Sequence, residues 1–381
     1  MKLRLGVLFG GASVEHEISI LTAMQAMDHL NKDTYEIIPM YFAKDQTLYQ
    51  GDACQNLENY KDLDGLVSKL EPISLYTKNG KTWMHFVSKR WKKDKEIDLL
   101  LPLMHGTYGE DGSVQGFLRM INASFCGSDL AGGVIGQDKM LMKQVLESNH
   151  LPVVPWVSFH SASFHESMLE DVCRSNTWPM IIKPAHLGSS IGIHMAHDRK
   201  ELLEGIEDAF RYDACVIVEQ AVSNLREFNC AVLGDEDSRI ISCVEEVHKE
   251  DEILSYHDKY EGGGKSKGMV SASRKIPANI SDEWTNRITK LAEDTFVALQ
   301  ASGVARIDFL SDGEQIYVNE INTLPGSLSF YLFEPLSISF TQLLDMLIEM
   351  ARKRQRKQSQ RIVTYPTNVL SSFQNGCKYQ K

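Results

Sequence analysis

The chain has 381 residues, of which 43% are hydrophobic and 24% charged, and its formal net charge is −11. This length predicts two or three domains, and the composition is that of an ordinary globular protein, which excludes a wholly disordered chain. The acidic balance argues against a general nucleic-acid-binding protein, and no apolar run approaches a membrane span in length.

The charge is unevenly distributed along the chain. Residues 352–381 contain eight Lys or Arg and no Asp or Glu, so this tail is +8 and the remainder is −11 − 8 = −19. The basic tail matches no recognisable site and is expected to be a solvated extension. Seven scattered cysteines without a C-x-x-C pair predict reduced, mostly buried thiols. Together with an apolar N-terminal run too short for a signal peptide, they predict a cytoplasmic protein.

The N-terminal segment reads as the entry of an α/β domain. Residues 3–9 predict a buried strand, followed by the loop GGASVEHE and apolar residues at helical spacing. The adjacent glycines do not match the dinucleotide fingerprint G-x-G-x-x-G. Glu15 falls in the first helical turn, where the helix dipole favours a carboxylate. Glu15 either binds a ligand ammonium or is an ordinary helix-start residue.

A second apolar run leads to a possible site residue. The polar residues 44–100 carry little motif information and predict peripheral hairpins and loops, whereas residues 97–104 are typical of a central parallel strand. This strand ends at His105, in the sequence HGTYGEDG. Ligands of open α/β sheets bind at the carboxyl ends of strands, although a single His there is often structural.

Two lysines in the middle of the chain are candidate phosphate ligands. A domain boundary is expected near residue 136, and Lys139 then lies in the first turn of a helix capped by Asp138, where the dipole disfavours a cation. Lys183 lies on the expected strand 179–185, ahead of a Gly-Ser-Ser-x-Gly loop. The backbone N–H groups and hydroxyls of this loop, from Ser189 and Ser190, suit phosphate. The spacing is not that of a Walker A motif.

The next strand, residues 214–220, predicts an adenosine site. It delivers Glu219, its continuation offers backbone groups to an adenine edge, and Glu227 follows within reach of ribose hydroxyls. The backbone groups belong to Gln220, Ala221 and Val222. Residues 251–278 form a long Gly-, Lys- and Ser-rich loop, which favours a lid with Lys259 and Tyr260 reaching inward.

A β-hairpin near the C-terminal end carries the most informative pattern. Residues 304–310 and 316–321 alternate like strands around a Ser-Asp-Gly turn. Arg306 and Asp308 share one face, as do Glu320 and Asn322. An odd-numbered loop or a bulge is required to bring all four to the same face. Two carboxylates and an amide oxygen suit Mg²⁺, and a neighbouring Arg suits a phosphate or a developing oxyanion.

Taken together, these motifs resemble the D-alanine:D-alanine ligases of the ATP-grasp superfamily, from the first strand to about residue 352. The matching motifs, in chain order, are GGASVEHEIS, HGTYGEDGSVQG, GQDK, IIKPAHLGSSIG, VEQ, DKY, ARIDF and NEINTLPG. The resemblance implies an α/β fold: an N-terminal substrate domain with an open parallel sheet (residues 1–136) precedes α+β grasp domains at 137–222 and 223–352, the latter with the lid 251–278. Residues 353–381 remain as the basic tail.

The resemblance also implies a role for each matching residue. Glu15 would bind the ammonium of the first D-alanine and join Ser189 and Tyr260 in holding the lid closed, and His105 would lie near that substrate's carboxyl group. Phosphates would be held by Lys139, Lys183, Lys259 and the loop containing Ser190. Adenine would meet Glu219, Gln220, Ala221 and Val222, and ribose would meet Glu227. Two Mg²⁺ ions, or Mn²⁺, would be bound by Asp308, Glu320 and Asn322. Arg306 and the N–H of Gly326 would stabilise the tetrahedral intermediate.

The implied reaction is ATP-dependent synthesis of D-alanyl-D-alanine through an acyl phosphate, for peptidoglycan precursors. The implied partners are small molecules, with no nucleic acid and no membrane, and dimers are common in the family. The chain departs from the family after Thr-Leu-Pro-Gly, because Tyr331 and Leu332 stand where a Ser-Leu pair usually binds the second substrate's carboxylate. That function would then move to Ser327 or Ser329.

This departure leaves D-serine and D-lactate open as second substrates. Another ATP-grasp carboxylate–amine ligase and a nucleotide-binding regulator without turnover are further alternatives.

Overall fold

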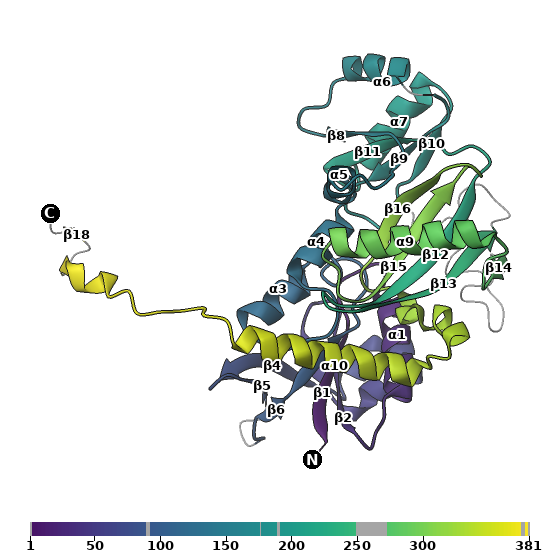
Figure 1. Ribbon diagram of the computed structural model, residues 1–381. Helices are drawn as coiled ribbons and strands as arrows, with labels where there is room; N and C mark the ends of the chain where they lie inside the picture. Colours follow the sequence, from purple (N-terminus) through teal and green to yellow (C-terminus); the bar gives the residue numbers. More distant parts are fainter. Residues whose placement is uncertain are drawn as a thin grey trace.

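The computed structural model describes residues 2–88, 92–175, 177–188, 191–248, 273–374 and 378–379. The predicted loop residues Ser189 and Ser190 and the predicted lid residues Lys259 and Tyr260 lie outside these ranges. Three β-sheets follow one another along the body of the chain (Figure 1), and a fourth, of two short strands, β17 (Phe373–Gln374) and β18 (Lys378–Tyr379), lies in the C-terminal tail. None of the described helices is both long enough and apolar enough to cross a membrane, and the described cysteines are all free thiols.

The first sheet has seven strands in the order β6-β5-β4-β3-β2-β1-β7. These strands are β1 (Leu3–Gly10), β2 (Tyr35–Phe42), β3 (Leu48–Gln50), β4 (Glu71–Lys78), β5 (Lys81–Phe86), β6 (Lys95–Ile97) and β7 (Leu99–Pro102). The expected parallel pairing is confirmed for β7-β1-β2. Helix α1 (His16–His29) connects β1 to β2, and such a crossover is what parallel neighbouring strands require.

The hairpins expected in the polar region after β2 are present, and their antiparallel strands extend the sheet itself. One sequence expectation for this sheet was wrong. Strand β7 lies at the end of the sheet rather than at its centre. Its residues are nevertheless all buried, because α10 packs against it and Phe125 forms a parallel bridge with Leu100.

Four shorter helices accompany the first sheet and lead to the second. They are α2 (Leu63–Val67), α3 (Ser113–Met120), α4 (Leu130–Gln137) and α5 (Lys139–Ser148). As expected, Asp138 caps α5, its side chain accepting hydrogen bonds from the N–H groups of Met140 and Leu141. Buried Met142 and Leu146 of α5 pack into the core of the third sheet, so this helix joins the two later sheets.

The second sheet has four strands in the order β10-β9-β11-β8. The strands are β8 (Trp156–His160), β9 (Met180–Pro184), β10 (His194–Ala196) and β11 (Cys215–Gln220), and they pack with helices α6 (Leu169–Ser175) and α7 (Arg199–Ala209). This unit forms the upper lobe in Figure 1.

The third sheet has five strands in the order β14-β13-β12-β15-β16. They are β12 (Arg226–Gly234), β13 (Arg239–His248), β14 (Ser273–Lys275), β15 (Gly303–Ser311) and β16 (Ile316–Asn322). Helix α9 (Asp282–Ala298) covers one face of this sheet (Figure 1). Its Ser281 accepts a hydrogen bond from the N–H of Trp284 as an N-cap. The other face carries apolar residues that pack with α10, such as Leu233 and Val304, as well as polar groups.

The last helix, α10 (Phe340–Ser359), joins the first and third sheets. It begins with the expected capping box of Ser339 and Gln342 and shares one hydrophobic core with β1, β7, β12 and β15. The helix continues past residue 352, which corrects the expected start of the solvated tail. Arg354 donates to the backbone carbonyls of Phe125 and Gly127, the second at 2.8 Å.

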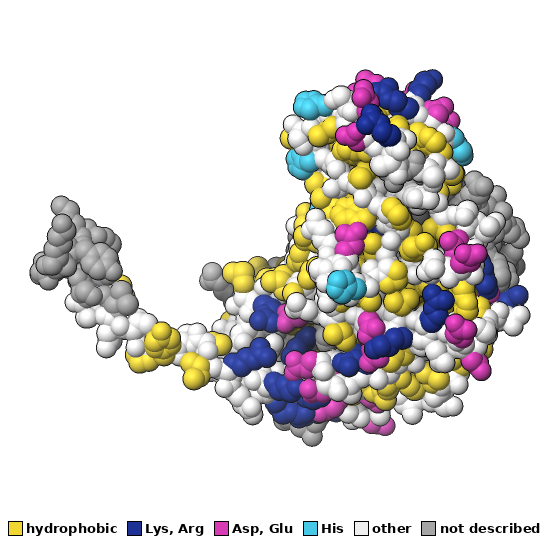
Figure 2. Space-filling view, turned by 45° about the horizontal axis from the view of Figure 1, so that its top comes forward, with side chains coloured by type: hydrophobic (Ala, Val, Ile, Leu, Met, Phe, Trp, Pro, Cys, Tyr) yellow, Lys and Arg dark blue, Asp and Glu magenta, His cyan; other side chains and the backbone are white. Residues whose placement is uncertain are grey.

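The tail beyond α10 projects away from the body (Figure 1). Figure 2 shows hydrophobic side chains along it, and Ile362 and Val363 are each 86% exposed. This segment therefore fits the expected solvated extension.

Candidate active site

The hairpin β15–β16 brings its four predicted polar residues to one face through a bulge. The connecting loop has four residues, 312–315, since Ser311 pairs with Ile316. Regular pairing from that point would place Glu320 on the opposite face from Asp308. The register instead shifts between Phe309–Val318 and Asp308–Glu320, so that Arg306 lies opposite Asn322 and Asp308 opposite Glu320.

Arg306 and Asp308 form a two-pronged ion pair. The Nε of Arg306 donates to Oδ1 of Asp308 at 2.6 Å and a terminal nitrogen donates to Oδ2 at 2.7 Å, while Asn322 donates to Oδ2 at 3.2 Å. Burial raises the pKa of Asp308, the charge of Arg306 lowers it and the charge of Glu320 raises it, with a net increase. Asp308 and Glu320 thus form a costly concentration of negative charge, which a cation would relieve.

The donor set on this hairpin fits Mg²⁺. No group of three or more His, Cys, Asp or Glu side chains suited to a metal occurs in the described ranges. The predicted set has only two carboxylates, with the amide oxygen of Asn322 as its third member, and Mg²⁺ usually takes one or two carboxylates when a substrate phosphate supplies further oxygens. Asp308, Glu320 and Asn322 could together hold such an ion.

The predicted phosphate lysines converge on this hairpin. Lys183 on β9 donates to Oδ1 of Asn319, the bulge residue, at 3.2 Å and pairs with Glu219 at 2.6 Å. Lys139 donates through Nζ to the carbonyl of Leu187 at 2.5 Å. Burial lowers the pKa of Lys139 despite the opposing charge of Glu320. Burial also acts to lower the pKa of Lys183, but the charges of Glu219 and Glu320 outweigh it and raise that pKa. Glu320 therefore acts electrostatically on both lysines.

Sequence reasoning missed Lys143, which is completely buried on α5. Its Nζ lies 2.8 Å from Oε1 of Glu219, whose side chain is 2% exposed. Burial alone would raise the pKa of Glu219, but the charges of Lys143 and Lys183 lower it to about 2. Glu219 is therefore an ionised carboxylate held between two lysines. The spacing of Lys143 from Lys139, four residues, was the available signal, because such residues share a helix face.

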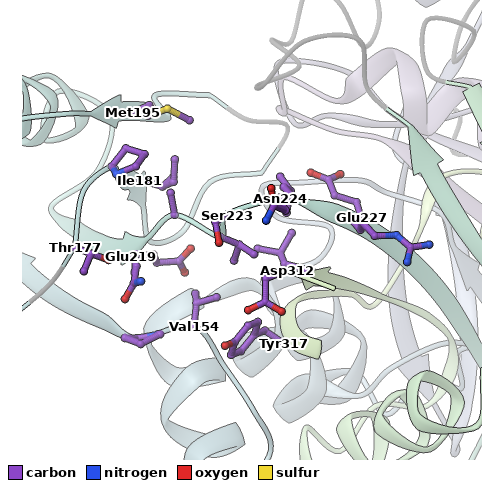
Figure 3. Close-up of a pocket in the computed structure, with 18 of the residues that line it drawn as sticks. Val154, Thr177, Ile181, Met195, Glu219, Ser223, Asn224, Glu227, Asp312 and Tyr317 are labelled. Atoms are coloured by element: carbon purple, nitrogen blue, oxygen red, sulfur yellow. The ribbon is translucent and has the colours of Figure 1, made fainter. Parts of the chain in front are cut away.

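A cavity of about 820 Å³ lies between the second and third sheets. Its walls include Lys183, Glu219 and Glu227 together with the predicted adenine segment Gln220, Ala221 and Val222. In Figure 3, Glu219 and Glu227 lie on opposite sides of this cavity, with Ser223 and Asn224 between them. The N–H groups of Gln220 and Ala221 donate to the carbonyls of Pro155 and Pro179. The volume is in the range of small-molecule sites.

The N-terminal unit contributes carboxylates to the same region. A Cβ built on Gly106 would lie 3.2 Å from Oε2 of Glu15, and one on Gly188 would lie 3.6 Å from Oε1. Glu15 thus lies between the HGTYGEDG loop and the start of the Gly-Ser-Ser loop. Glu110 was not among the site residues predicted from the sequence. Its side chain accepts a hydrogen bond from the N–H of Gly106 at 2.8 Å. Burial and the charge of Glu15 raise the pKa of Glu110 to about 8, against the opposing charge of Arg306.

His105 is buried, with 3% of its surface exposed. Its Nε2 lies 2.9 Å from the hydroxyl of Thr22, which in turn accepts the N–H of Ser327 at 3.2 Å. Burial lowers the pKa of His105 to about 4, so the ring is neutral at pH 7. His105 therefore supports the turn after β16 through Thr22.

The 3₁₀ segment Gly326–Leu332 separates the four predicted residues for the second substrate. Ser327 hydrogen-bonds to Gln25 of α1 at 2.6 Å, and Ser329 and Leu332 are buried, the latter in the shared core. The hydroxyl of Tyr331 lies 3.3 Å from Glu245 of β13, so this side chain reaches the third sheet. Gly326, the predicted oxyanion N–H donor, opens the segment.

Comparisons with known proteins agree with this geometry. Residues 4–128 match the family model "D-ala D-ala ligase N-terminus" and residues 145–349 match "D-ala D-ala ligase C-terminus". The chain is 36% identical to the D-alanine--D-alanine ligase of Thermosipho melanesiensis, over 97% of this chain and 98% of the relative. The corresponding ligase of Thermosipho africanus is 38% identical over 96% and 98%.

Two solved structures extend the comparison. The D-alanine-D-alanine ligase from Coxiella burnetii superposes with a TM-score of 0.81 at 28% identity, covering 94% of this chain and 96% of the other. The VanG D-Ala:D-Ser ligase from Enterococcus faecalis gives 0.78 at 28%, covering 92% and 100%. The fold is that of the ATP-grasp ligases, and the chain belongs to the D-alanine--D-alanine ligase family, which consists of ATP-dependent ligases.

Proposed function

We propose that this chain uses ATP to join two D-alanine molecules into D-alanyl-D-alanine. Family membership supports the reaction class. The observation that carries the proposal is the position of Lys183, which lines the cavity between the sheets and also contacts the bulge of the β15–β16 hairpin. A nucleotide in that cavity would have its phosphates directed toward Asp308, Glu320 and Arg306.

The first step activates a carboxylate. A carboxylate resists attack by an amine, so the first D-alanine accepts the terminal phosphoryl group of ATP and becomes an acyl phosphate. Lys139 and Lys183 would hold the phosphates, and Glu15 would bind the substrate ammonium. The family uses ATP and Mg²⁺; an ion on Asp308, Glu320 and Asn322 would neutralise phosphate charge.

The second step forms the amide bond. The amine of the second D-alanine, having lost a proton, attacks the acyl-phosphate carbonyl and phosphate leaves. Charge develops on the carbonyl oxygen, and Arg306 with the N–H of Gly326 would stabilise it. Since acyl phosphates hydrolyse, exclusion of water is required; the predicted lid residues Lys259 and Tyr260, with Ser189 and Ser190, are assigned to that closure and to phosphate binding.

Several finer assignments belong to the same proposal. Functional units at residues 1–136, 137–222 and 223–352 would correspond to the three sheets. The product would serve peptidoglycan precursor synthesis in the cytoplasm, and a homodimer would be consistent with the family.

A second candidate differs only in the second substrate. The similarity to a D-Ala:D-Ser ligase at 28% identity, together with Tyr331 in place of the usual Ser, favours D-serine as the alternative acceptor.

The test is product identification. The purified protein is incubated with ATP, Mg²⁺ and D-alanine, alone or with D-serine or D-lactate, and products are resolved by mass spectrometry alongside ADP release. We expect D-alanyl-D-alanine as the main product. The same assay compares Arg306→Ala, which removes the proposed oxyanion donor, with a matched control. The control is Arg174→Ala, at a side chain that is 75% exposed on α6. ATP binding without ADP release, whatever the D-amino acid, would favour a regulatory module instead.

A further inference from the structure

A row of polar residues crosses the third sheet and continues beyond the predicted metal ligands. Glu245 on β13 pairs with Asn229 on β12, Asn229 pairs with Asp308 on β15, and Asp308 pairs with Glu320 on β16. Residues directly opposite in paired strands share a face. All four side chains therefore belong to the face that carries the site, and Glu245 marks its far end.

The far end of this row carries a cation and a hydroxyl. Glu245 is fully buried and accepts a hydrogen bond from Nδ2 of Asn229 at 2.8 Å. The hydroxyl of Tyr331 lies 3.3 Å from the same carboxylate. One terminal nitrogen of Arg274 lies 3.3 Å from Glu245 and 3.2 Å from the Tyr331 hydroxyl. Glu245 thus holds both groups in fixed positions.

Arg274 retains binding capacity toward the site. Within the described part of the chain, its polar contacts involve a single terminal nitrogen, whereas a guanidinium carries five N–H donors. Its side chain is 31% exposed, so a ligand can reach it. Arg306 lies near enough for its charge to act on Tyr331. The Tyr331 hydroxyl fixes one terminal nitrogen of Arg274 at 3.2 Å, and the remaining donors of this guanidinium suit a small carboxylate.

Of the neighbouring alternatives, two are engaged elsewhere, and the third, Ser329, is 0% exposed although its hydroxyl has no hydrogen-bond partner among the described residues. The hydroxyl of Ser327 donates to Gln25, and the side chain of Leu332 lies in the core. We propose that Arg274, positioned by Glu245 and by the hydroxyl of Tyr331, binds the α-carboxylate of the second D-amino acid. This inference rests on the proposed ligase function and assigns carboxylate recognition to a residue outside the motifs that carry the family resemblance.

D-alaninamide tests recognition of the second substrate's carboxylate separately from activation of the first substrate. It has no carboxylate to be phosphorylated, so it can react only as the second substrate. The assay supplies ATP, Mg²⁺, D-alanine and D-alaninamide at a fixed ratio and measures dipeptide amide relative to dipeptide by mass spectrometry. Because the ratio is compared between variants, the intrinsic reactivity of the two amines cancels.

Removing the cation should relax the choice of acceptor. In Arg274→Met we expect the amide-to-dipeptide ratio to rise by at least about tenfold, because a charge-assisted contact to the acceptor carboxylate is lost. Tyr331→Phe should raise it by a smaller factor. Lys275→Met is the matched control, because neighbouring residues of a strand point to opposite faces; its ratio should equal that of the wild type.

The outcomes are distinct. If Arg274 served only to support the 3₁₀ segment, Arg274→Met would slow both products equally, and an unchanged ratio overturns the inference. Should Arg274→Met fail to fold, Arg274→Lys keeps the charge and loses the planar fork. Its ratio should lie between that of the wild type and the increase of about tenfold expected for Arg274→Met. A wild-type ratio in both Arg274→Lys and Tyr331→Phe again overturns the inference. A wild-type protein that forms no dipeptide contradicts the proposed function itself.

Discussion

Lys143 provides the sharpest test of how the centre of the site is held together. Its Nζ lies 2.8 Å from Glu219, and the two side chains are 0% and 2% exposed. Glu219 also pairs with Lys183 at 2.6 Å. The substitution Lys143→Met replaces a cation by an apolar side chain of similar length, and it leaves a buried carboxylate with one of its two lysines.

The expected cost follows from this geometry. Removing one partner of a buried ion pair costs about 3–5 kcal/mol. Because Lys183 still partners Glu219, we expect the lower end, about 3 kcal/mol. For a unit of 150–250 residues, each kcal/mol lowers Tm by about 2–4 °C. The transition that includes α5 should therefore move down by roughly 6–12 °C.

The assay is thermal unfolding followed by calorimetry without ligands. Lys200→Met is the control, since Lys200 is 83% exposed on α7 and should change stability by less than about 0.5 kcal/mol. The double variant Lys143→Met/Glu219→Gln should not recover this loss, because it leaves Lys183 without its carboxylate partner. A Tm of Lys143→Met within the range of the Lys200→Met control would refute the role of Lys143 as a stabilising counterion.

Three further outcomes are expected. Arg306→Ala should lower kcat by about 10²–10³ while largely retaining ATP binding, as measured by ADP release and titration calorimetry; equal activity would reject its oxyanion role. Hydrogen bonds to Asp138 and Asp213 raise the pKa of His186 to about 10. The stabilisation from protonated His186 should therefore be complete below the unfolded-state pKa of about 6.5 and be lost as pH rises through about 10. The Tm difference between the wild type and His186→Gln should shrink over the same pH range, and a difference that does not change with pH would contradict this. Arg354→Met should lower the free energy of unfolding by about 2 kcal/mol through lost charge-assisted hydrogen bonds; an unchanged denaturant midpoint would show that this contact is dispensable.

Local chemistry explains why much of the architecture was predictable. Asp138 and Ser339 cap the helices that follow them, because capping depends on residues within one turn. The hairpin around Arg306 and Asp308 follows from alternation and turn residues, and the order of motifs along the chain identified the family.

The sequence by itself therefore determined the local elements, the reaction class and which residues have the chemistry to take part. Only the tertiary structure decided which of them meet. The bulge at Asn319, the burial of Lys143 against Glu219, and the approach of Arg274 to Tyr331 join residues from separate strands and helices. The physical reason is that charge pairing and burial depend on distance in space, and no pattern within a single strand or helix specifies its partner in another.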